Sequence, residues 1–276
     1  MIDALYGRKI ELIVGGKQFV NELGKDGLTI NFDVPFDDDK EPNVATIQVI
    51  NLSDQTIHGM KKGAPVILNA GYQNDAGSIF LGFVEKPATQ WQGVDKVTEI
   101  KAVDGSESWL RTTIKRTYKA GITGKAIISD LLGMTGLEIG SFNLPTDRLY
   151  RGGKTINTTL SKAIAEVAKD CGAKAHVTRG KIFIRPKDEG QTIGFVIDRE
   201  HGLIASPTPI EKEAGEGKNK KTVSGWKVVS LLNHRISTDA IVEIKSKTAN
   251  GTFRVEKGRH YGDGRAFYTE MEVYPV

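Results

Sequence analysis

Strict alternation of apolar and polar residues marks one stretch near the start of the chain, Leu28-Thr29-Ile30-Asn31-Phe32-Asp33-Val34. A second stretch repeats the pattern, with Ala45, Ile47 and Val49 separated by polar residues. Because successive side chains of a strand point to opposite faces, a period of two predicts strands with one buried face and one face in water. Half-buried strands of this kind are typical of antiparallel sheets.

Further candidate strands occupy the same part of the chain. They cover residues 8–14, 65–71, 78–84 and 95–103. Short runs that contain Gly, Asn or Asp separate them, and these residue types are common in tight turns. Many short strands with regular turns predict a β-barrel or a β-sandwich.

The period changes in the middle of the chain. At 123–133 apolar residues recur at helical spacing, Thr123 can cap the first turn, and Gly133 can end the helix. At 158–171 a single apolar stripe predicts a second helix, with Gly172 just after its end. The middle of the chain is therefore expected to differ in structure from the part before it.

Strands return after the second predicted helix. Two short ones, 174–178 and 181–185, are joined by Arg179-Gly180, so the middle of the chain is predicted to be a small α+β unit. The alternation then resumes in several segments, 192–197, 225–232, 240–246, 251–259 and 266–275. Between the first two of these lies 211–221, a charged run with a single alanine, for which we expect a mobile loop.

Length and charge divide the chain in the same way. A chain of 276 residues exceeds one typical domain, and two or three domains are expected. The net charge is +4, but residues 1–104 carry −5, residues 105–187 carry +9 and residues 188–276 are neutral. The predicted domains are 1–105, 106–187 and 188–276.

The sequence contains no catalytic motif that we can identify. Gly153-Lys154-Thr155 lacks the earlier glycine that a phosphate-binding loop requires, because Arg148 stands in its place. No Gly-x-Ser-x-Gly occurs, and the five histidines lie too far apart in sequence for the spacing of zinc ligands. We therefore expect no enzyme activity, no cofactor and no metal site.

Other residues that could carry chemistry have simpler structural explanations. The acidic run Asp37-Asp38-Asp39-Lys40-Glu41 could ligate a cation, but it lacks the glycine and the closing glutamate of a calcium loop, and an exposed hairpin loop is expected. Cys171 is the only cysteine and lies on an apolar helix stripe, which predicts a buried thiol in a protein made in a reducing cytoplasm. Core packing is expected for Trp91, Trp109 and Trp226.

Four features follow one another along the chain in a characteristic order. They are the strands Asn43–Ser53, Val66–Tyr72 and Ile79–Val84, then the helix at 158–171 with its hairpin, then Gly202–Thr208, and finally Gly251–Val255 with His260–Glu272. This order resembles the hub proteins of bacteriophage tails, a group related to the late-control protein D family and to the spike-carrying hubs of contractile tails. The resemblance covers nearly the whole chain, although known hubs are often longer.

The resemblance implies a mainly β (α+β) fold, with two tail-tube-like antiparallel β-barrel domains and an inserted small α/β domain. It also implies a homotrimer, because three copies with two barrels each form a ring that can dock onto a hexameric tail tube and a trimeric spike or tip. Such a baseplate hub contacts other baseplate proteins and lines the channel through which genomic DNA passes without specific binding. The implied location is the virion, after synthesis in the host cytoplasm, with no membrane anchor.

Within this plan, the basic middle segment is expected to dock an acidic protein partner. The candidate residues flank the first predicted helix and are Arg111, Lys115, Arg116, Lys119, Arg148, Arg151 and Lys154. A channel that lets DNA slide gains nothing from an attractive wall, since each neutralised phosphate adds affinity. These side chains are therefore placed on the outside of the ring, and the alternative is that they are solvated and contact nothing.

Three other functions stay open at this point. A distal tail or tail-tube adaptor protein would form hexamers instead of trimers. A DNA-binding protein would explain the basic middle segment and would bind DNA in a salt-sensitive manner. A peptidoglycan hydrolase would need a pair of catalytic carboxylates, and no placement of Glu and Asp in the sequence indicates one.

Overall fold

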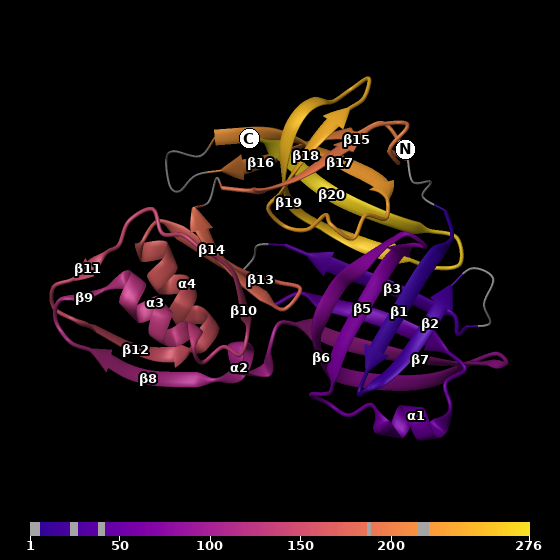
Figure 1. The fold of residues 1–276 in the computed structure, drawn as a ribbon, viewed down its shortest axis with the longest axis horizontal. Helices are drawn as coiled ribbons and strands as arrows, with labels where there is room; N and C mark the ends of the chain where they lie inside the picture. The colour runs from indigo at the N-terminus through magenta and orange to yellow at the C-terminus, as the bar shows by residue number, and fades with distance from the viewer. Residues whose placement is uncertain (1–5, 23–26, 38–41, 187–188, 215–220) are drawn as a thin grey trace.

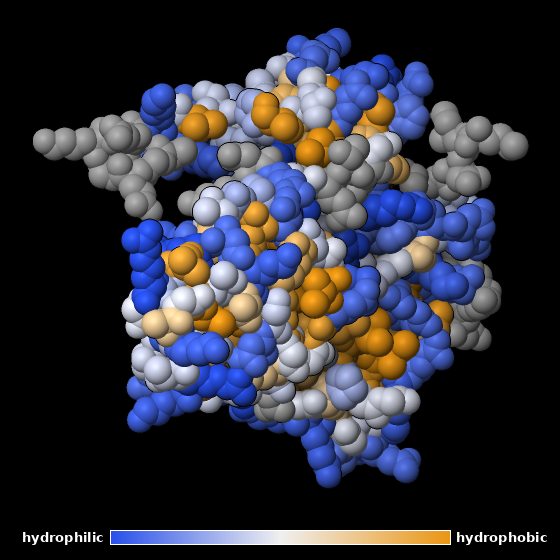
Figure 2. Space-filling view, turned by 60° about the vertical axis from the view of Figure 1, so that its left-hand side comes forward, coloured by the Kyte–Doolittle hydropathy of each residue, from blue (hydrophilic) through white to orange (hydrophobic). Residues whose placement is uncertain are grey.

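A computed structural model describes residues 6–22, 27–37, 42–186, 189–214 and 221–276. Strands dominate this part of the chain, and short helices gather in its middle (Figure 1). On the side of the molecule shown in Figure 2, hydrophilic residues cover most of the surface and apolar residues form small groups between them. The prediction of a mainly β fold with helices in the middle is confirmed.

The first hundred residues form β1 (Arg8–Val14), β2 (Lys17–Glu22), β3 (Ile30–Phe36), β4 (Val44–Ile50), α1 (Asp54–Gly59), β5 (Pro65–Tyr72), β6 (Asp75–Gln92) and β7 (Asp95–Asp104). The middle unit consists of α2 (Glu107–Arg111), β8 (Thr113–Tyr118), β9 (Ile122–Thr123), α3 (Gly124–Leu132), β10 (Glu138–Phe142), β11 (Leu149–Tyr150), β12 (Lys154–Thr159), α4 (Leu160–Asp170), β13 (Ala173–Thr178) and β14 (Lys181–Pro186). The last part forms β15 (Gln191–Ile197), β16 (Thr208–Ala214), β17 (Lys221–Leu231), β18 (Ala240–Lys245), β19 (Asn250–Gly262) and β20 (Phe267–Pro275).

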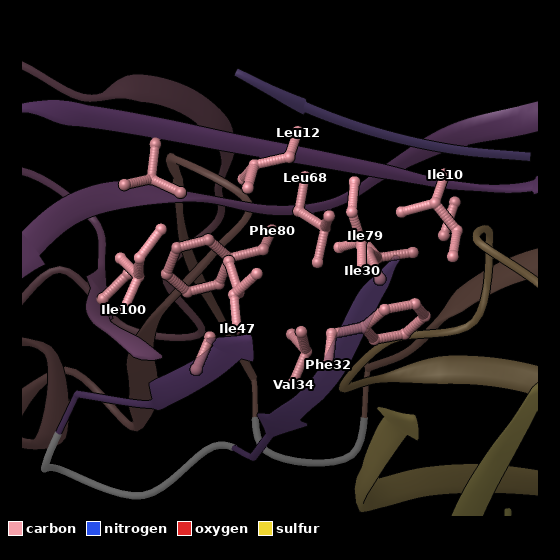
Figure 3. Packing of buried hydrophobic residues seen from close by; sticks show 14 of the residues in the cluster. Ile10, Leu12, Ile30, Phe32, Val34, Ile47, Leu68, Ile79, Phe80 and Ile100 are labelled. Atoms are coloured by element: carbon pink, nitrogen blue, oxygen red, sulfur yellow. The ribbon is translucent and has the colours of Figure 1, made fainter. Parts of the chain in front are cut away.

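The alternating stretch near the N-terminus forms β3 and fills the core of the first sheet region. Ile30, Phe32 and Val34 are buried, and the polar residues between them are partly exposed. Figure 3 shows these three side chains directed into a cluster with apolar residues of the neighbouring strands. Phe267, from the far end of the chain, joins the same cluster and packs edge-on against Phe32 and Tyr72. The predicted period of two is confirmed, and the first core includes a residue of the last strand.

The two β-rich parts of the chain share one sheet of 13 strands. Its main path runs β16-β17-β20-β19-β3-β4-β7-β6-β5-β1-β2, with β18 paired to β19 and β15 paired to β18. The prediction of two separate barrels is therefore not confirmed: in the described residues no set of strand pairs closes into a barrel. All of these pairings are antiparallel except that of β15 with β18.

The length of β19 explains how the two parts join. The first half of this strand pairs with β18 and its second half pairs with β3, where His260 lies opposite Val34. A strand of 13 residues is long enough to have two neighbours along one edge. The sequence indicates a strand at this place, but alternation alone cannot show which distant strand it will pair with.

A second cluster of buried residues lies under the C-terminal strands. It takes one residue from β3, Phe36, and its other members come from the last part of the chain, for example Val228, Val242 and Met271. Trp226 is half-buried against this cluster, as predicted, and Trp109 is buried in the middle unit. Core packing is thus confirmed for two of the three tryptophans.

The middle unit has a core of its own, built by α3 and α4 against short sheets. Thr123 accepts a hydrogen bond from the backbone N–H of Ala126 and caps α3, which ends at Leu132 before Gly133. The apolar stripe of α4 is buried, and Cys171, at the end of the helix, is fully buried as predicted. Both predicted helices of this unit are confirmed.

The predicted mobile loop at 211–221 is partly wrong. Residues 208–214 form β16, which pairs with the start of β17 from Lys221 onward, and 215–220 lie outside the described residues. A charged strand at the end of a sheet is common, because charges on an edge discourage pairing with other chains. The acidic residues 38–41 also lie outside the described residues. The sequence also did not predict strands β2, β8, β9, β10, β11 and β12 or helices α1 and α2.

Candidate functional site

The structure brings six of the seven predicted basic residues together around one two-stranded ribbon, β8–β12. Lys115 and Arg116 lie on β8, Lys119 follows it, and Lys154 begins β12. Arg148 and Arg151 flank β11 on the chain leading into β12. Gly153 allows the start of β12 to approach the end of β8 closely. It has a φ of 80°, and a Cβ at this position would lie 2.5 Å from the carbonyl oxygen of Tyr118. Arg111 lies apart from this ribbon, at the end of α2, where its guanidinium lies 5.9 Å from the centre of the Phe83 ring.

Three of these cations are neutralised by carboxylates of the middle unit. Arg116 pairs with Asp130 of α3, and the Tyr118 hydroxyl donates to the same carboxylate at 2.6 Å. Hydrogen bonds from Tyr118 and Arg116 lower the pKa of Asp130 below its ordinary value. This row of side chains faces the helices and fixes the ribbon onto them.

Asp170, at the end of α4, pairs with the other two neutralised cations, Arg148 and Lys154. Its carboxylate lies 3.4 Å from Arg148 and 3.6 Å from Lys154, and Lys154 also pairs with Glu166. These pairs are partly exposed, so each contributes little to stability. Their effect on function is to remove Arg148 and Lys154 from the set of cations available to a partner.

Three further cations, Lys115 on the outer face of β8 and Lys119 and Arg151 in the connecting segments, have no carboxylate partner among the described residues. Lys115, Lys119 and Arg151 are exposed, and no ion pair involves them in the part of the chain that the structure describes. Uncharged polar residues surround Lys115 on this face, including Thr117, which contacts Thr155 of β12 at 3.2 Å between hydroxyl oxygens. The candidate docking surface is thus narrower than the sequence indicated.

A second polar site, absent from the sequence predictions, lies where the middle unit meets the two sheet regions. We call it the junction, and at its centre is Arg179 in the turn between β13 and β14. The Arg179 guanidinium donates to the carbonyl oxygens of Ser78 at 3.4 Å and His234 at 2.8 Å, and to the Ser237 hydroxyl at 2.9 Å. One side chain therefore joins all three parts of the chain.

Asp104, at the end of β7, belongs to the same junction. It is buried, and burial raises the pKa of its carboxyl to about 7, although the backbone N–H groups of Gly180 and Arg179 partly oppose this shift. A carboxyl group in such surroundings changes charge near neutral pH. The charge of Arg179, which is itself mostly buried, also lowers the pKa of this carboxyl.

Asp239 completes the junction with a cluster of buried charges. Its carboxylate lies 3.0 Å from Nε of Arg185 and pairs with Arg254, and His176 lies 3.5 Å away. Arg185 and His176 belong to the β13–β14 hairpin, whereas Arg254 belongs to β19. Asp239 itself has a φ of 67°, which is rare for a residue other than glycine. No sequence signal marks this residue, because its partners are distant in the chain.

A third feature is an arm formed by the second half of β6, the turn after it and the first two residues of β7, residues 85–96. Beyond Val84, β6 pairs with β7 alone among the described strands, and its side chains are mostly exposed. Trp91 is 70% exposed and Val94 is 92% exposed. The prediction that Trp91 packs in the core is therefore wrong, because it lies past the point where β5 covers β6.

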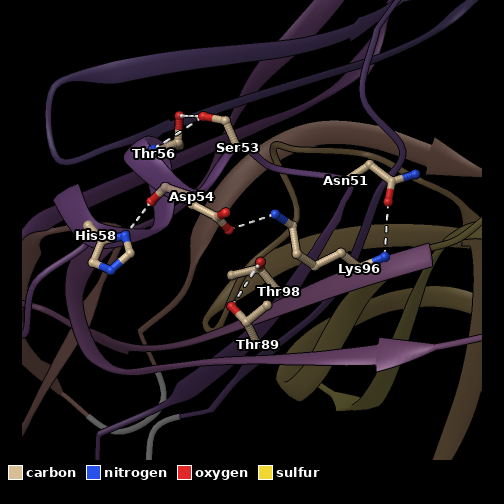
Figure 4. A network of polar contacts seen from close by, with 8 residues as sticks. All are labelled: Asn51, Ser53, Asp54, Thr56, His58, Thr89, Lys96 and Thr98. Atoms are coloured by element: carbon tan, nitrogen blue, oxygen red, sulfur yellow. Dashed lines mark hydrogen bonds and ion pairs between the residues drawn. The ribbon is translucent and has the colours of Figure 1, made fainter. Parts of the chain in front are cut away.

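A polar network, shown in Figure 4, holds the β7 side of the arm close to its turn. The Lys96 ammonium bonds to Asp54 of α1 at 2.8 Å, and the Lys96 backbone N–H donates to the side chain of Asn51 at 2.9 Å. The hydrogen bond from Lys96 lowers the pKa of Asp54. Thr89 and Thr98 link the two strands through their hydroxyls at 3.1 Å. An exposed aromatic residue is thus presented on an ordered support.

Two further observations concern other kinds of site. Within the described ranges, no group of three or more His, Cys, Asp or Glu side chains could hold a metal ion. None of the helices in the same ranges has the length and apolar character that crossing a bilayer would require.

Comparison with known proteins gives matches in structure but not in sequence. No protein-family model matches the chain, and no curated protein matches its sequence. The 43 kDa tail protein of prophage MuSo2 from Shewanella oneidensis is similar, with a TM-score of 0.67 and 12% identity over 96% of this chain and 98% of that one. A tail protein from Neisseria meningitidis gives a TM-score of 0.69 with 9% identity over 98% and 97% of the two chains.

A third match comes from a different machine. An Escherichia coli protein described as a component of the type VI secretion system, with structural similarity to bacteriophage T4 tail proteins, gives a TM-score of 0.66 at 8% identity. It covers 96% of this chain and 76% of that one. The chain therefore has the fold of phage tail proteins and of this secretion component, over nearly its whole length.

Proposed function

We propose that this chain is a structural subunit of a bacteriophage tail or baseplate and has no catalytic activity of its own. The observation that carries the proposal is the shared fold: two tail proteins match along 96–98% of this chain and 97–98% of their own. The likeness therefore extends over nearly the whole of each compared chain. Fold alone does not define a function, so the proposal also needs a test on the assembled protein.

More specifically, we propose a baseplate or tail-tip hub that assembles as a homotrimer. The two sheet regions of each copy would supply six similar units to a ring, with domains 1–105, 106–187 and 188–276 keeping the division predicted from the sequence. Such a ring would join the tail tube to a central spike or tip protein, contact other baseplate proteins and surround the DNA channel. Strands β2 and β16, at the two ends of the main sheet path, have unpaired outer edges in the described structure and are available for contacts between copies.

The mass of the assembled ring tests the hub directly. We expect light scattering or native mass spectrometry to give three times 30.1 kDa, and electron micrographs to show a ring with a central channel. Six copies would instead support a distal tail or tail-tube adaptor protein. A protein that stays monomeric at the concentrations found in assembling tails, and is absent from purified particles, would contradict a structural role in the tail.

The match to the secretion component favours a second candidate, a subunit of a type VI secretion system. Both machines would use the chain as a structural part, so the ring alone does not separate them. Mass spectrometry of purified phage particles does, because a tail subunit must be present there in a fixed ratio to the tube protein.

A further inference from the structure

The β8–β12 ribbon has an open edge on its β8 side. In the described residues β8 pairs with β12 and with no other strand. Figure 1 shows β8 at the outer border of the middle unit, away from both sheet regions. The ribbon is anchored on its inner face, where Ile114 and Ile156 are buried in the core of the middle unit. An open edge on an anchored ribbon can accept one more strand.

The register of the ribbon identifies which backbone groups face this edge. The backbone N–H of Leu160 donates to the carbonyl of Thr112 at 2.8 Å, one step beyond the last pair of the ribbon, Thr159 with Thr113. Hydrogen-bonded pairs alternate along an antiparallel ladder, so the even-numbered residues of β8 bond to β12. The N–H and C=O groups of Thr113, Lys115 and Thr117 therefore point to the open edge.

One of these three residues carries a charge, and two more cations lie close in the chain to the ribbon. Lys115 lies in the centre of the edge, Lys119 lies just beyond its end, and Arg151 lies on the neighbouring turn; none of them has a carboxylate partner in the described structure. By contrast, Arg116 and Lys154 are on the inner face and already paired. Open backbone groups and an unpaired cation thus coincide on β8, with two more cations on the segments that connect to the ribbon.

We propose that the β8 edge binds an extended acidic segment of a neighbouring protein, which adds to the ribbon as a third strand. Backbone hydrogen bonds to residues 113–117 give the segment its direction, and carboxylates near Lys115 and Lys119 give it selectivity. The central lysine also prevents two copies of this chain from pairing through the same edge, because their lysines would face each other. This proposal rests on the proposed function, which makes the neighbour a tail or baseplate protein.

The observations favour protein over DNA as the partner. Three free cations are few compared with the six to ten phosphate contacts, roughly, of a typical DNA-binding surface. A row of outward N–H and C=O groups matches a β-strand and has no counterpart in a duplex. The surface on this side of the molecule is hydrophilic with small apolar groups, as Figure 2 shows, and this suits a polar strand more than an apolar helix.

The test uses the full chain and a labelled probe, an acetylated and amidated octapeptide of alternating Thr and Glu. We expect fluorescence polarisation to show saturable binding that weakens as salt rises. Methylating the backbone nitrogens of one face of the peptide removes its hydrogen bonds and keeps its charge, and we expect binding to be lost. Equal binding of the methylated peptide, or no binding of the unmodified one, would overturn the proposal.

Variants locate the site. Charge reversal in the double variant Lys115→Glu and Lys119→Glu should weaken peptide binding by about tenfold or more, whereas Lys162→Glu, an exposed lysine on α4, should leave it unchanged. Thr117→Pro removes one outward N–H and should weaken binding, and Thr117→Val keeps this group and should not. If a DNA duplex binds more tightly than the peptide and the double variant abolishes that binding, the surface serves nucleic acid and the proposal fails.

The outcomes also separate this proposal from the hub. If the protein forms a ring but does not bind the peptide, the strand-addition proposal is contradicted and the hub proposal is supported. If the protein binds the peptide but never forms a ring, the hub proposal is contradicted and the strand-addition site is supported.

Discussion

Two hairpin turns of equal length lie in opposite surroundings. Arg179-Gly180 joins β13 to β14, and Gly93-Val94 joins β6 to β7; both are two-residue turns with glycine at positive φ, 71° and 65°. The first lies in the junction, where Arg179 bonds to two other parts of the chain. The second lies in water, and Val94 is 92% exposed. Local sequence specifies each turn, but only the surroundings separate a turn that holds the molecule together from one that is free to contact a partner.

The two hairpins therefore have different roles, one in stability and one in assembly. The buried turn and the Asp239 cluster beside it fix the orientation of the middle unit, and with it the direction in which the β8 edge points. The arm contributes little to that arrangement, because its network around Lys96 bonds to Asn51 and to Asp54 of α1 in the first part of the chain. Substitutions at the junction should therefore change stability, and substitutions at the arm tip should change assembly.

The largest effect is expected for Asp239→Ala. It removes the carboxylate that pairs with Arg185 and Arg254, and breaking one partner of a buried ion pair costs about 3–5 kcal/mol. The matched control is Asp130→Ala, which removes the carboxylate partner of Arg116 at a more exposed site and should cost at most about 1 kcal/mol. Denaturant unfolding measures both. Equal losses for the two variants would mean that the junction is no more important than a surface pair.

The next effect depends on pH and concerns Asp104. Its pKa is about 7 in the folded protein and close to 3.8 when unfolded, so the folded state retains a proton that the unfolded state releases. The resulting stability is complete below pH 3.8 and is lost as the pH rises through about 7. The side chain of Asp104→Asn cannot ionise. The free energy of unfolding of this variant, relative to that of wild type, should therefore rise by a few kcal/mol at most between pH 3.8 and about 7 and stay constant above that.

The difference between the two proteins isolates this carboxyl group. Burial lowers the pKa of His234, and it lowers that of His260 to about 3, but both histidines are present in wild type and variant and cancel. Unfolding is measured at a series of pH values on either side of 7. A flat difference would show that Asp104 stays ionised, stabilised by Arg179.

The buried turn itself could be predicted from the sequence, but its surroundings could not. Arg179-Gly180 between two short apolar segments indicates a hairpin by local chemistry alone. Its insertion beside Ser78 and Ser237 depends on contacts about 100 and 58 positions away in sequence, which no local pattern encodes. Similarly, alternation predicted β19 but could not show that it pairs with β3 and merges the two predicted barrels.

The predictions for the arm and for the basic surface were incomplete for related reasons. In β6 the sequence indicates a strand only at 78–84, because residues 85–92 are exposed on both faces and show no clear alternation. Without that pattern, the large apolar side chain of Trp91 was assigned to the core, although it is 70% exposed. The sequence identified a basic surface but could not sort its members. Asp130 and Asp170 neutralise part of it, and they lie on helices whose packing against the ribbon is a tertiary property.

A matched pair of glycine substitutions compares the two turns directly. Gly180→Ala and Gly93→Ala place an alanine at similar positive φ, which costs roughly 1–2 kcal/mol in each case. At Gly180 a Cβ would also lie 2.5 Å from the Leu81 side chain, whereas nothing lies within 4 Å at Gly93. Gly180→Ala should therefore lower the free energy of unfolding by about 1 kcal/mol more. The opposite ranking would mean that Leu81 moves aside without cost.

The smallest effect on stability is expected at the arm tip, and it is the most informative for function. Trp91 is 70% exposed and contacts Lys96 at 6.0 Å from its ring centre, so Trp91→Ala should change the free energy of unfolding by less than about 0.5 kcal/mol. Trp109→Ala, which removes a buried tryptophan, should cost about 3–5 kcal/mol. An exposed tryptophan on an ordered support is a frequent anchor of protein interfaces, so Trp91→Ala should reduce ring formation while the monomer stays folded. Ring formation is measured by size-exclusion chromatography with light scattering at a fixed protein concentration. Rings that form from Trp91→Ala as readily as from wild type would show that the arm does not take part in assembly and that the contacts between copies lie elsewhere, at the β2 and β16 edges.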